Sequence, residues 1–207
     1  MKILISGAAG FIGSALVSAL RRGGDEVHRM IRLDRIAHSG DVVWKPTKGF
    51  IQHRNLNDLD AVIHLCGENI FGRWTAHKKQ EIRDSRVIST QFLAQTLADL
   101  NAPPKVFLCA SAIGFYGNRG EEILTEQSPP GEGFLAEVCR QWEDACDPAR
   151  QAGIRTVNLR FGMVLGTGGG ALEQLLPIFH KGLGGPIGKG HQWMSWISIQ
   201  DVIGACL

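Results

Sequence analysis

Three glycines, spaced three residues apart, separate a short apolar run from a longer amphipathic one near the start of the chain. The stretch reads KILISGAAGFIGSALVSALRR, and the glycines are Gly7, Gly10 and Gly13. The apolar run predicts a strand, and the run after it has the apolar spacing of a helix. In that setting the first glycine permits a tight turn, the second lets backbone N–H groups approach a diphosphate, and the third lets helix and strand pack closely. We therefore assign this turn, with Phe11 and Ile12, to binding a dinucleotide, and keep a purely structural turn as the alternative.

The rest of the chain alternates in the same way between apolar bursts and amphipathic runs. The strands expected are residues 2–6, 26–31, 41–44, 60–66, 105–111 and 155–161, and the helices expected are 11–22, 75–100, 133–153 and 171–180. This alternation predicts an α/β fold, a doubly wound parallel sheet with helices on both faces. We expect a dinucleotide-binding domain over residues 1–165 and the start of a substrate-binding region over 166–207. The final run SIQDVIGACL looks like a helix cut off partway, so we expect a chain truncated at its C-terminus.

The second expected strand ends without a carboxylate, and an arginine follows it. Proteins that bind NAD commonly place Asp or Glu there for the ribose hydroxyls, whereas those that bind NADP place an arginine near the 2′-phosphate. Here Arg32 follows the strand at once, with Arg29 and Arg35 close in sequence. A guanidinium suits a phosphate because it donates a planar pair of hydrogen bonds. The sequence therefore favours NADP(H), with NAD as the alternative if Asp34 binds the ribose or Arg32 is only a solvated surface residue.

Composition argues against several classes of protein. A net charge of +2, without a basic stripe between aromatics, gives no case for a nucleic-acid partner. The first apolar run is too short for a signal peptide, and no run is long enough to span a bilayer. The five cysteines form no CxxC pair and the seven histidines show no metal-binding spacing, which predicts reduced structural thiols and no metal. We expect a cytoplasmic protein with a small-molecule substrate.

Several later stretches resemble one known family. CASAIGFYG, LRFGMVLG and GKGHQWMSWISIQDV are similar to motifs of the extended short-chain dehydrogenases, and CGENI, GRWT, QWE and GLGGPIG extend the likeness along the whole chain. The chain resembles the epimerase-like atypical subgroup of the NAD(P)-dependent epimerase/dehydratase family, whose members are commonly labelled nucleoside-diphosphate-sugar epimerases. The resemblance implies an NAD(P)-binding Rossmann fold and an oxidoreductase or epimerase acting on a small or nucleotide-sugar substrate, and it is compatible with a homodimer.

The catalytic pair that this family implies is absent. Its members use a Tyr-x-x-x-Lys pair, in which the lysine lowers the pKa of the tyrosine, and the pair should lie within residues 133–153. The only tyrosine of the chain is Tyr116, and Gly120 stands four residues later, so no such pair exists. Phe134 or Leu135 takes the place of the tyrosine, and Val138 or Cys139 that of the lysine. The alternative function is therefore a protein that binds NADP(H) without turnover, as a sensor or structural ligand.

Two hydroxyls could substitute for the missing pair. The resemblance matches Ser111 to the family's serine, which hydrogen-bonds the reacting oxygen beside the cofactor; the alternative is a hydroxyl that caps the strand-end loop. Tyr116 could present its phenol to the substrate if Arg119 or a distant residue approached it, but a packed loop aromatic with a wet tip is the simpler interpretation. After the fourth long strand, we expect Gly67 to let the backbone approach the cofactor's ribose, with Cys66 as a small neighbour.

The substrate region of the relatives falls late in this chain. The resemblance assigns Gln192 and Trp193 to the substrate, whereas Trp196 is expected in the core. The usual histidine of that motif is Ser198 here, which weakens the carry-over. The glycine-rich residues 166–170, ahead of an expected helix, could form a second anion site or a flexible loop over the active site.

Four further side chains have simpler structural explanations. His64 falls inside a buried strand and is expected to be a hydrogen-bonded structural residue. Cys139 is expected on the buried face of its helix, since a free cysteine packs as a small hydrophobe. Glu137 and Arg140 are expected on the solvated face of the same helix.

Overall fold

A seven-stranded sheet organises the protein, in a computed structural model that describes residues 1–32, 37–53, 56–186 and 188–207. The strand order is β4-β3-β2-β1-β5-β6-β7, and every neighbouring pair is parallel except β3 with β4. The strands are β1 (Lys2–Ser6), β2 (Glu26–Arg32), β3 (Val42–Lys45), β4 (Phe50–Ile51), β5 (Ala61–His64), β6 (Val106–Ala112) and β7 (Arg155–Phe161). Parallel order with helical crossovers confirms the predicted doubly wound α/β fold.

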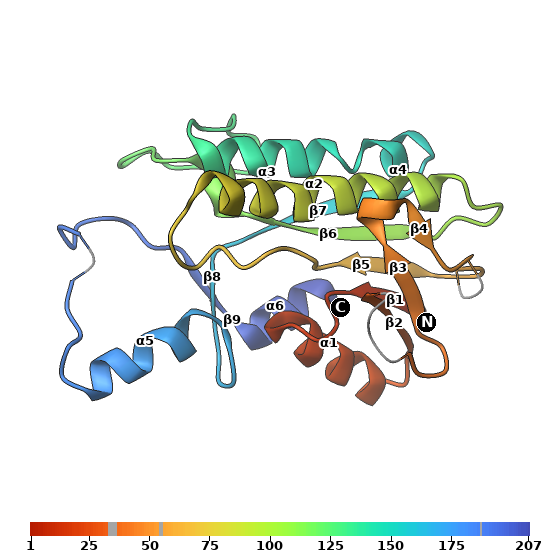
Figure 1. The fold of residues 1–207 in the computed structure, drawn as a ribbon, viewed down its shortest axis with the longest axis horizontal. Helices are drawn as coiled ribbons and strands as arrows, with labels where there is room; N and C mark the ends of the chain where they lie inside the picture. The colour runs from red at the N-terminus through yellow and green to blue at the C-terminus, as the bar shows by residue number, and fades with distance from the viewer. Residues whose placement is uncertain (33–36, 54–55, 187) are drawn as a thin grey trace.

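Helices cover both faces of the sheet (Figure 1). One face carries α1 (Phe11–Arg22) and α6 (Ile199–Cys206), and the other carries α2 (Ala76–Ala98), α3 (Phe134–Asp144) and α4 (Asp147–Gln151). Strand residues alternate between the two layers, because successive side chains of a strand point to opposite faces. In β1, Ile3 and Ile5 pack with the α1 layer, whereas Leu4 packs with the α2 layer.

One predicted helix differs from the structure. The helix expected over residues 133–153 is two helices, because α3 ends at Asp144 and Pro148, which lacks a backbone N–H donor, stands in the first turn of α4. The short segment between β3 and β5 holds a 3-10 turn (Pro46–Lys48) and the antiparallel strand β4 in place of a full helical crossover.

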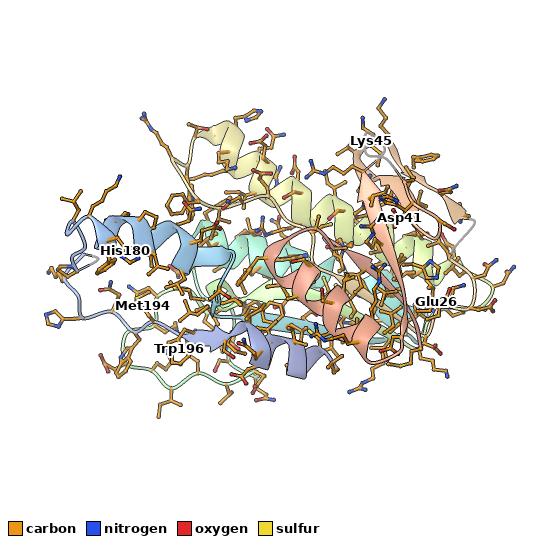
Figure 2. All side chains as sticks on the ribbon, turned by 90° about the horizontal axis from the view of Figure 1, so that it is seen from below. Glu26, Asp41, Lys45, His180, Met194 and Trp196 are labelled. Carbon is orange, nitrogen blue, oxygen red and sulfur yellow. The ribbon has the colours of Figure 1, made fainter. Side chains whose placement is uncertain are left out.

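Residues 163–198 form a smaller unit beside the sheet. Strands β8 (Met163–Leu165) and β9 (Trp196–Ser198) pair in parallel, and α5 (Gly170–His180) extends away from the body. Figure 2 shows Met194 and Trp196 in this part of the molecule, at the end opposite Glu26 and Lys45. Trp196 is 65% exposed, so its predicted place in the core is wrong. The domain boundary at 165/166 stays a prediction.

Candidate functional site

The turn between β1 and α1 has a backbone that only glycine can form. Gly7 has a φ of +71°, and a Cβ on it would lie 2.8 Å from the carbonyl oxygen of Leu65. A Cβ on Gly13 would lie 2.2 Å from the Gly7 carbonyl oxygen, which no side chain could tolerate. Gly10 is the N-cap of α1 and has no side chain to bond the first N–H groups, and the first turn holds no acidic residue. The N-terminus of α1 therefore offers unfilled N–H donors at the carboxyl edge of the sheet.

The second glycine-rich loop packs on the first. A Cβ on Gly169 would lie 2.5 Å from the Phe11 ring, and one on Gly170 would lie 2.9 Å from it. A Cβ on Gly166 would meet Phe11 at 3.0 Å and Ile199 at 2.7 Å. These glycines thus let the loop before α5 close over the aromatic side chain that begins α1. The contact explains the glycines by packing, and the predicted anion site there stays a prediction.

The arginines near the end of β2 differ in their partners. Arg29 holds Asp41 through two hydrogen bonds of 3.0 and 2.8 Å, from Nε and Nη2, so it is already engaged. Arg32 is exposed, and its side chain makes no hydrogen bond or ion pair to any residue that the structure describes. Asp34 and Arg35 lie outside the described residues. Of the two arginines described here, Arg32 is therefore the one whose side chain is left for a ligand.

A buried chain of hydrogen bonds links the ends of β1 and β5 to α2. The Leu65 N–H donates to Ser6 Oγ at 3.2 Å, and Ser6 Oγ lies 2.6 Å from Nδ1 of His64. Nε2 of His64 lies 3.3 Å from Ser89 Oγ, which donates to the Ser85 carbonyl at 2.6 Å. Because the Ser89 hydrogen is used there, Nε2 carries the ring hydrogen and Nδ1 accepts from Ser6. The predicted structural role of His64 is confirmed, and burial lowers its pKa to about 3.

The loop after β5 is held by consecutive residues of α2. The Glu68 N–H donates to Ser85 Oγ at 2.9 Å, and Arg86 Nη1 donates to the Glu68 carbonyl at 3.0 Å. A Cβ on Gly67 would lie 3.0 Å from Cζ of Arg86, so the guanidinium gives Gly67 a structural reason that the sequence did not suggest. The pKa of Glu68 is lowered mainly by its hydrogen bond with Lys78, and less by the charges of Arg32 and Arg86.

The two candidate catalytic hydroxyls belong to one network. Ser111 donates to Oε1 of Glu143 at 2.6 Å, and Glu143 receives two further bonds of 2.8 Å from Nε and Nη2 of Arg160. Nη1 of Arg160 donates to the Tyr116 hydroxyl at 3.0 Å, and its Cζ lies 3.5 Å from the centre of the Phe115 ring. The distant residue that approaches Tyr116 is thus Arg160 on β7. Sequence reasoning missed this arginine, and the only signal was its place inside an apolar strand.

Apolar side chains fill the positions expected for the tyrosine and lysine. The site for a Cβ on Gly114 is 3.4 Å from Leu135 and 3.6 Å from the Cys139 sulfur, so the turn after β6 (Ile113–Tyr116) packs directly on α3. Cys139 is buried as predicted, and burial raises the pKa of its thiol. Glu137 and Arg140 are exposed and bonded to each other, which confirms the solvated face.

The predicted substrate residues lie on a different loop. Gln192 and Trp193 stand between α5 and β9, and Trp193 is 78% exposed. Its indole N–H donates to Oε2 of Glu121 at 3.0 Å, which ties this loop to the one that follows Tyr116. The hydrogen bonds found in the described part of the chain do not join Trp193 to Ser111 or Tyr116.

Two further properties hold for the described residues. No helix formed by residues 1–32, 37–53, 56–186 and 188–207 is both long and apolar enough to cross a membrane. Within the same ranges, no three His, Cys, Asp or Glu side chains are grouped so as to hold a metal ion.

Known proteins resemble this chain along its whole length. The sequence profile of the NAD dependent epimerase/dehydratase family matches residues 3–207. The chain belongs to this family. An epimerase family protein of Mycobacterium bovis is 43% identical over 204 residues, which are 98% of this chain and 67% of the relative. Human SDR39U1, also an epimerase family protein, is 36% identical over 210 residues, 99% of this chain and 68% of the relative. The chain thus spans about two thirds of the length of these relatives.

Solved structures in the family share the fold over the whole chain. A nucleoside-diphosphate sugar epimerase from Corynebacterium glutamicum matches with a TM-score of 0.86 and 38% identity, covering 100% of this chain and 42% of that one. The structure of human SDR39U1 (isoform 2) with NADPH matches with a TM-score of 0.86 and 34% identity, covering 100% of this chain and 68% of that one. The likeness confirms the family and the Rossmann fold expected from the motifs.

Proposed function

We propose that this chain binds NADP(H) and forms the cofactor-binding part of an oxidoreductase or epimerase that acts on a small molecule, such as a nucleotide sugar. The observation that carries the proposal is the uncapped N-terminus of α1, which follows a turn packed so closely on its own backbone that a Cβ on Gly7 or Gly13 would clash. Such a turn lets backbone N–H groups approach a diphosphate. The human relative whose structure was determined with NADPH has the same fold. All five cysteines are free thiols, which suits a cytoplasmic protein.

Arg32 is the residue we assign to the 2′-phosphate. It ends β2, next to the strand that leads into the glycine turn, and it is exposed. Its charge lowers the pKa of Cys66 and of Glu68 in the loop after β5, and this is the loop that should meet the adenosine half of the cofactor. Backbone of Cys66 and Gly67 would then face the ribose.

NADP(H), when bound, supplies the hydride donor or acceptor. The chain's own contribution is to bind the reacting oxygen, and we assign this to Ser111 and Tyr116, which meet through Glu143 and Arg160. We assign Gln192 and Trp193 to the substrate on the family resemblance.

A second function, binding of NADP(H) without turnover, is favoured by one observation. Leu135 and Cys139 are packed against Gly114 where the family's tyrosine and lysine would stand, so α3 presents no proton donor at that point. Fold alone does not decide between an enzyme and a binding protein.

Cofactor binding is tested by titrating the protein with NADPH and with NADH while the nucleotide's fluorescence is followed. We expect Arg32→Ala to weaken NADPH by about tenfold or more, since a charge-assisted bond to phosphate contributes about 1.5–3 kcal/mol, and to leave NADH nearly unchanged. Arg22→Ala, on the exposed last turn of α1, is the control. Failure of the wild type to bind either nucleotide would refute the proposal, and equal losses for both nucleotides would remove Arg32 from the 2′-phosphate.

Turnover is tested separately on a panel of carbonyl compounds and nucleotide sugars. If the chain is an enzyme, we expect a substrate to cause loss of NADPH absorbance. The rate of that loss should be lower in Ser111→Ala and in Tyr116→Phe. Tight NADPH binding with no turnover across the panel would favour the second function.

A further inference from the structure

The Arg86 guanidinium lies at the carboxyl edge of the sheet, between α2, α3 and the loop after β5. Its Nη1 donates to the carbonyl oxygens of Ile82 and Glu68, each at 3.0 Å. The site for a Cβ on Gly67 is 3.0–3.4 Å from Cζ, Nη2 and Nε, and the centre of the Trp142 ring lies 5.1 Å from Cζ. Backbone at Gly67 and the indole therefore hold the guanidinium in one orientation.

The other edge of this guanidinium has no partner. Both Nη1 hydrogens are used, whereas Nε and Nη2 make no hydrogen bond, and no carboxylate forms an ion pair with Arg86, among the residues that the structure describes. Burial is the main influence on its pKa, which it lowers. A half-buried cation without a counter-ion costs free energy, so a ligand that supplied one would be bound favourably.

Other arginines of this chain show which groups bind to the Nε and Nη2 edge of a guanidinium. The carboxylates of Asp41, Glu122, Glu137 and Glu143 each accept one bond from Nε and one from Nη2 of an arginine. This pair of parallel donors matches two oxygens of one carboxylate or phosphate. In Arg86 the same pair is left for an oxyanion from outside the chain.

Arg86 lies near one of the positions expected for the missing lysine. Cys139 occupies one of the two places expected for that lysine, and its thiol pKa is raised by burial and lowered, to a smaller degree, by the charge of Arg86. A cation from α2 thus stands beside the place where the family has one on α3.

We propose that the Nε and Nη2 edge of Arg86 binds an oxyanion of the substrate, a carboxylate or phosphate group, beside α3. The proposal rests on the proposed function, because the oxyanion belongs to the molecule that would meet NADP(H) at this edge. It narrows the substrate to acidic small molecules and makes Arg86 a substrate-binding residue.

The test is calorimetric titration of the protein with oxalate and, in a separate series, with inorganic phosphate, each with and without saturating NADPH. We expect the wild type to bind at least one of these anions at millimolar concentrations. Arg86→Ala and Arg86→Gln should weaken that anion about tenfold or more, and Arg86→Lys should weaken it as well, since lysine lacks the paired donors. Arg83→Ala, on the exposed surface of the same helix, is the matched control and should bind like the wild type.

NADPH affinity, measured on every variant, separates the outcomes. Unchanged NADPH binding with a lost anion supports the proposal and shows that Arg86→Ala is folded; Arg86→Gln, which keeps much of the side chain, serves if the alanine variant is not. Wild-type protein that binds neither anion, variants that bind it normally, or equal losses of anion and NADPH would each overturn the proposal. A wild-type protein that binds an anion but does not bind NADPH would instead refute the proposed cofactor.

Discussion

Mild acid is expected to destabilise the protein through His64. This side chain is 0% exposed, and burial holds its pKa at about 3, against 6.5 for an ordinary histidine. In the unfolded chain His64 therefore binds a proton near pH 6.5, whereas in the folded chain it binds one only near pH 3. The stability that neutral His64 provides is complete above pH 6.5 and is lost progressively as the pH falls from 6.5 to 3.

The magnitude follows from the difference between the two pKa values. It is about three and a half units, and at about 1.4 kcal/mol per unit the full loss is on the order of 5 kcal/mol. Domains are commonly stable by about 5–15 kcal/mol, so this one group could remove a large share. Between pH 6 and 5 the slope should approach 1.4 kcal/mol per pH unit, before most carboxylates begin to titrate.

The assay is urea unfolding followed by circular dichroism at several pH values from 7.5 to 5. His64→Gln is the matched variant, because its amide can still donate to Ser89 Oγ but does not titrate. We expect it to be less stable than the wild type at pH 7.5 and to have a flatter profile. A wild-type free energy of unfolding that stays constant down to pH 5, or a glutamine variant with the same slope, would refute the reasoning.

Two further substitutions test the turn and the network. Gly13→Ala places a Cβ 2.2 Å from the Gly7 carbonyl oxygen, so NADPH affinity should fall by about a hundredfold and the thermal midpoint should drop, as measured by nucleotide fluorescence and calorimetry. Glu143→Gln leaves the Arg160 charge without its counter-ion at 12–19% side-chain exposure, and should cost about 3 kcal/mol in urea unfolding, whereas removing the exposed Arg140 should cost under about 1 kcal/mol.

The parts of the fold that depend on neighbours in sequence were predictable. Glycines at residues 7, 10 and 13, the alternation of apolar runs and the arginine that ends β2 are local patterns, and each has the expected place. Pro148, which lacks a backbone N–H donor, is the local signal that could have divided the helix expected over residues 133–153. Trp196 was expected in the core because a large aromatic side chain is usually buried. The residues near it in sequence do not show which part of the surface is left uncovered by other elements.

The side-chain partners at the site were not predictable in the same way. Arg160 and Ser111 are separated by 49 positions and meet because β6 and β7 pair in register at these two residues. The Arg86 orientation depends on Gly67 and Trp142, which come from a loop and a different helix. Such contacts depend on topology and rotamers, and periodicity along the chain carries no information about either.

The hydrogens of the network distinguish its two hydroxyls. Ser111 has a single hydrogen, and Glu143 accepts it, so in this arrangement the serine can only accept a bond from a ligand. To bind a carbonyl oxygen, its hydroxyl must first turn away from Glu143. The oxygen of Tyr116 accepts from Arg160 and keeps its own hydrogen, so Tyr116 can still donate one to a reacting oxygen. The role of the absent tyrosine can therefore fall to Tyr116, with Ser111 and Glu143 fixing the guanidinium that orients it. If the chain turns over a substrate, loss of the phenol should reduce the rate more than loss of the serine hydroxyl.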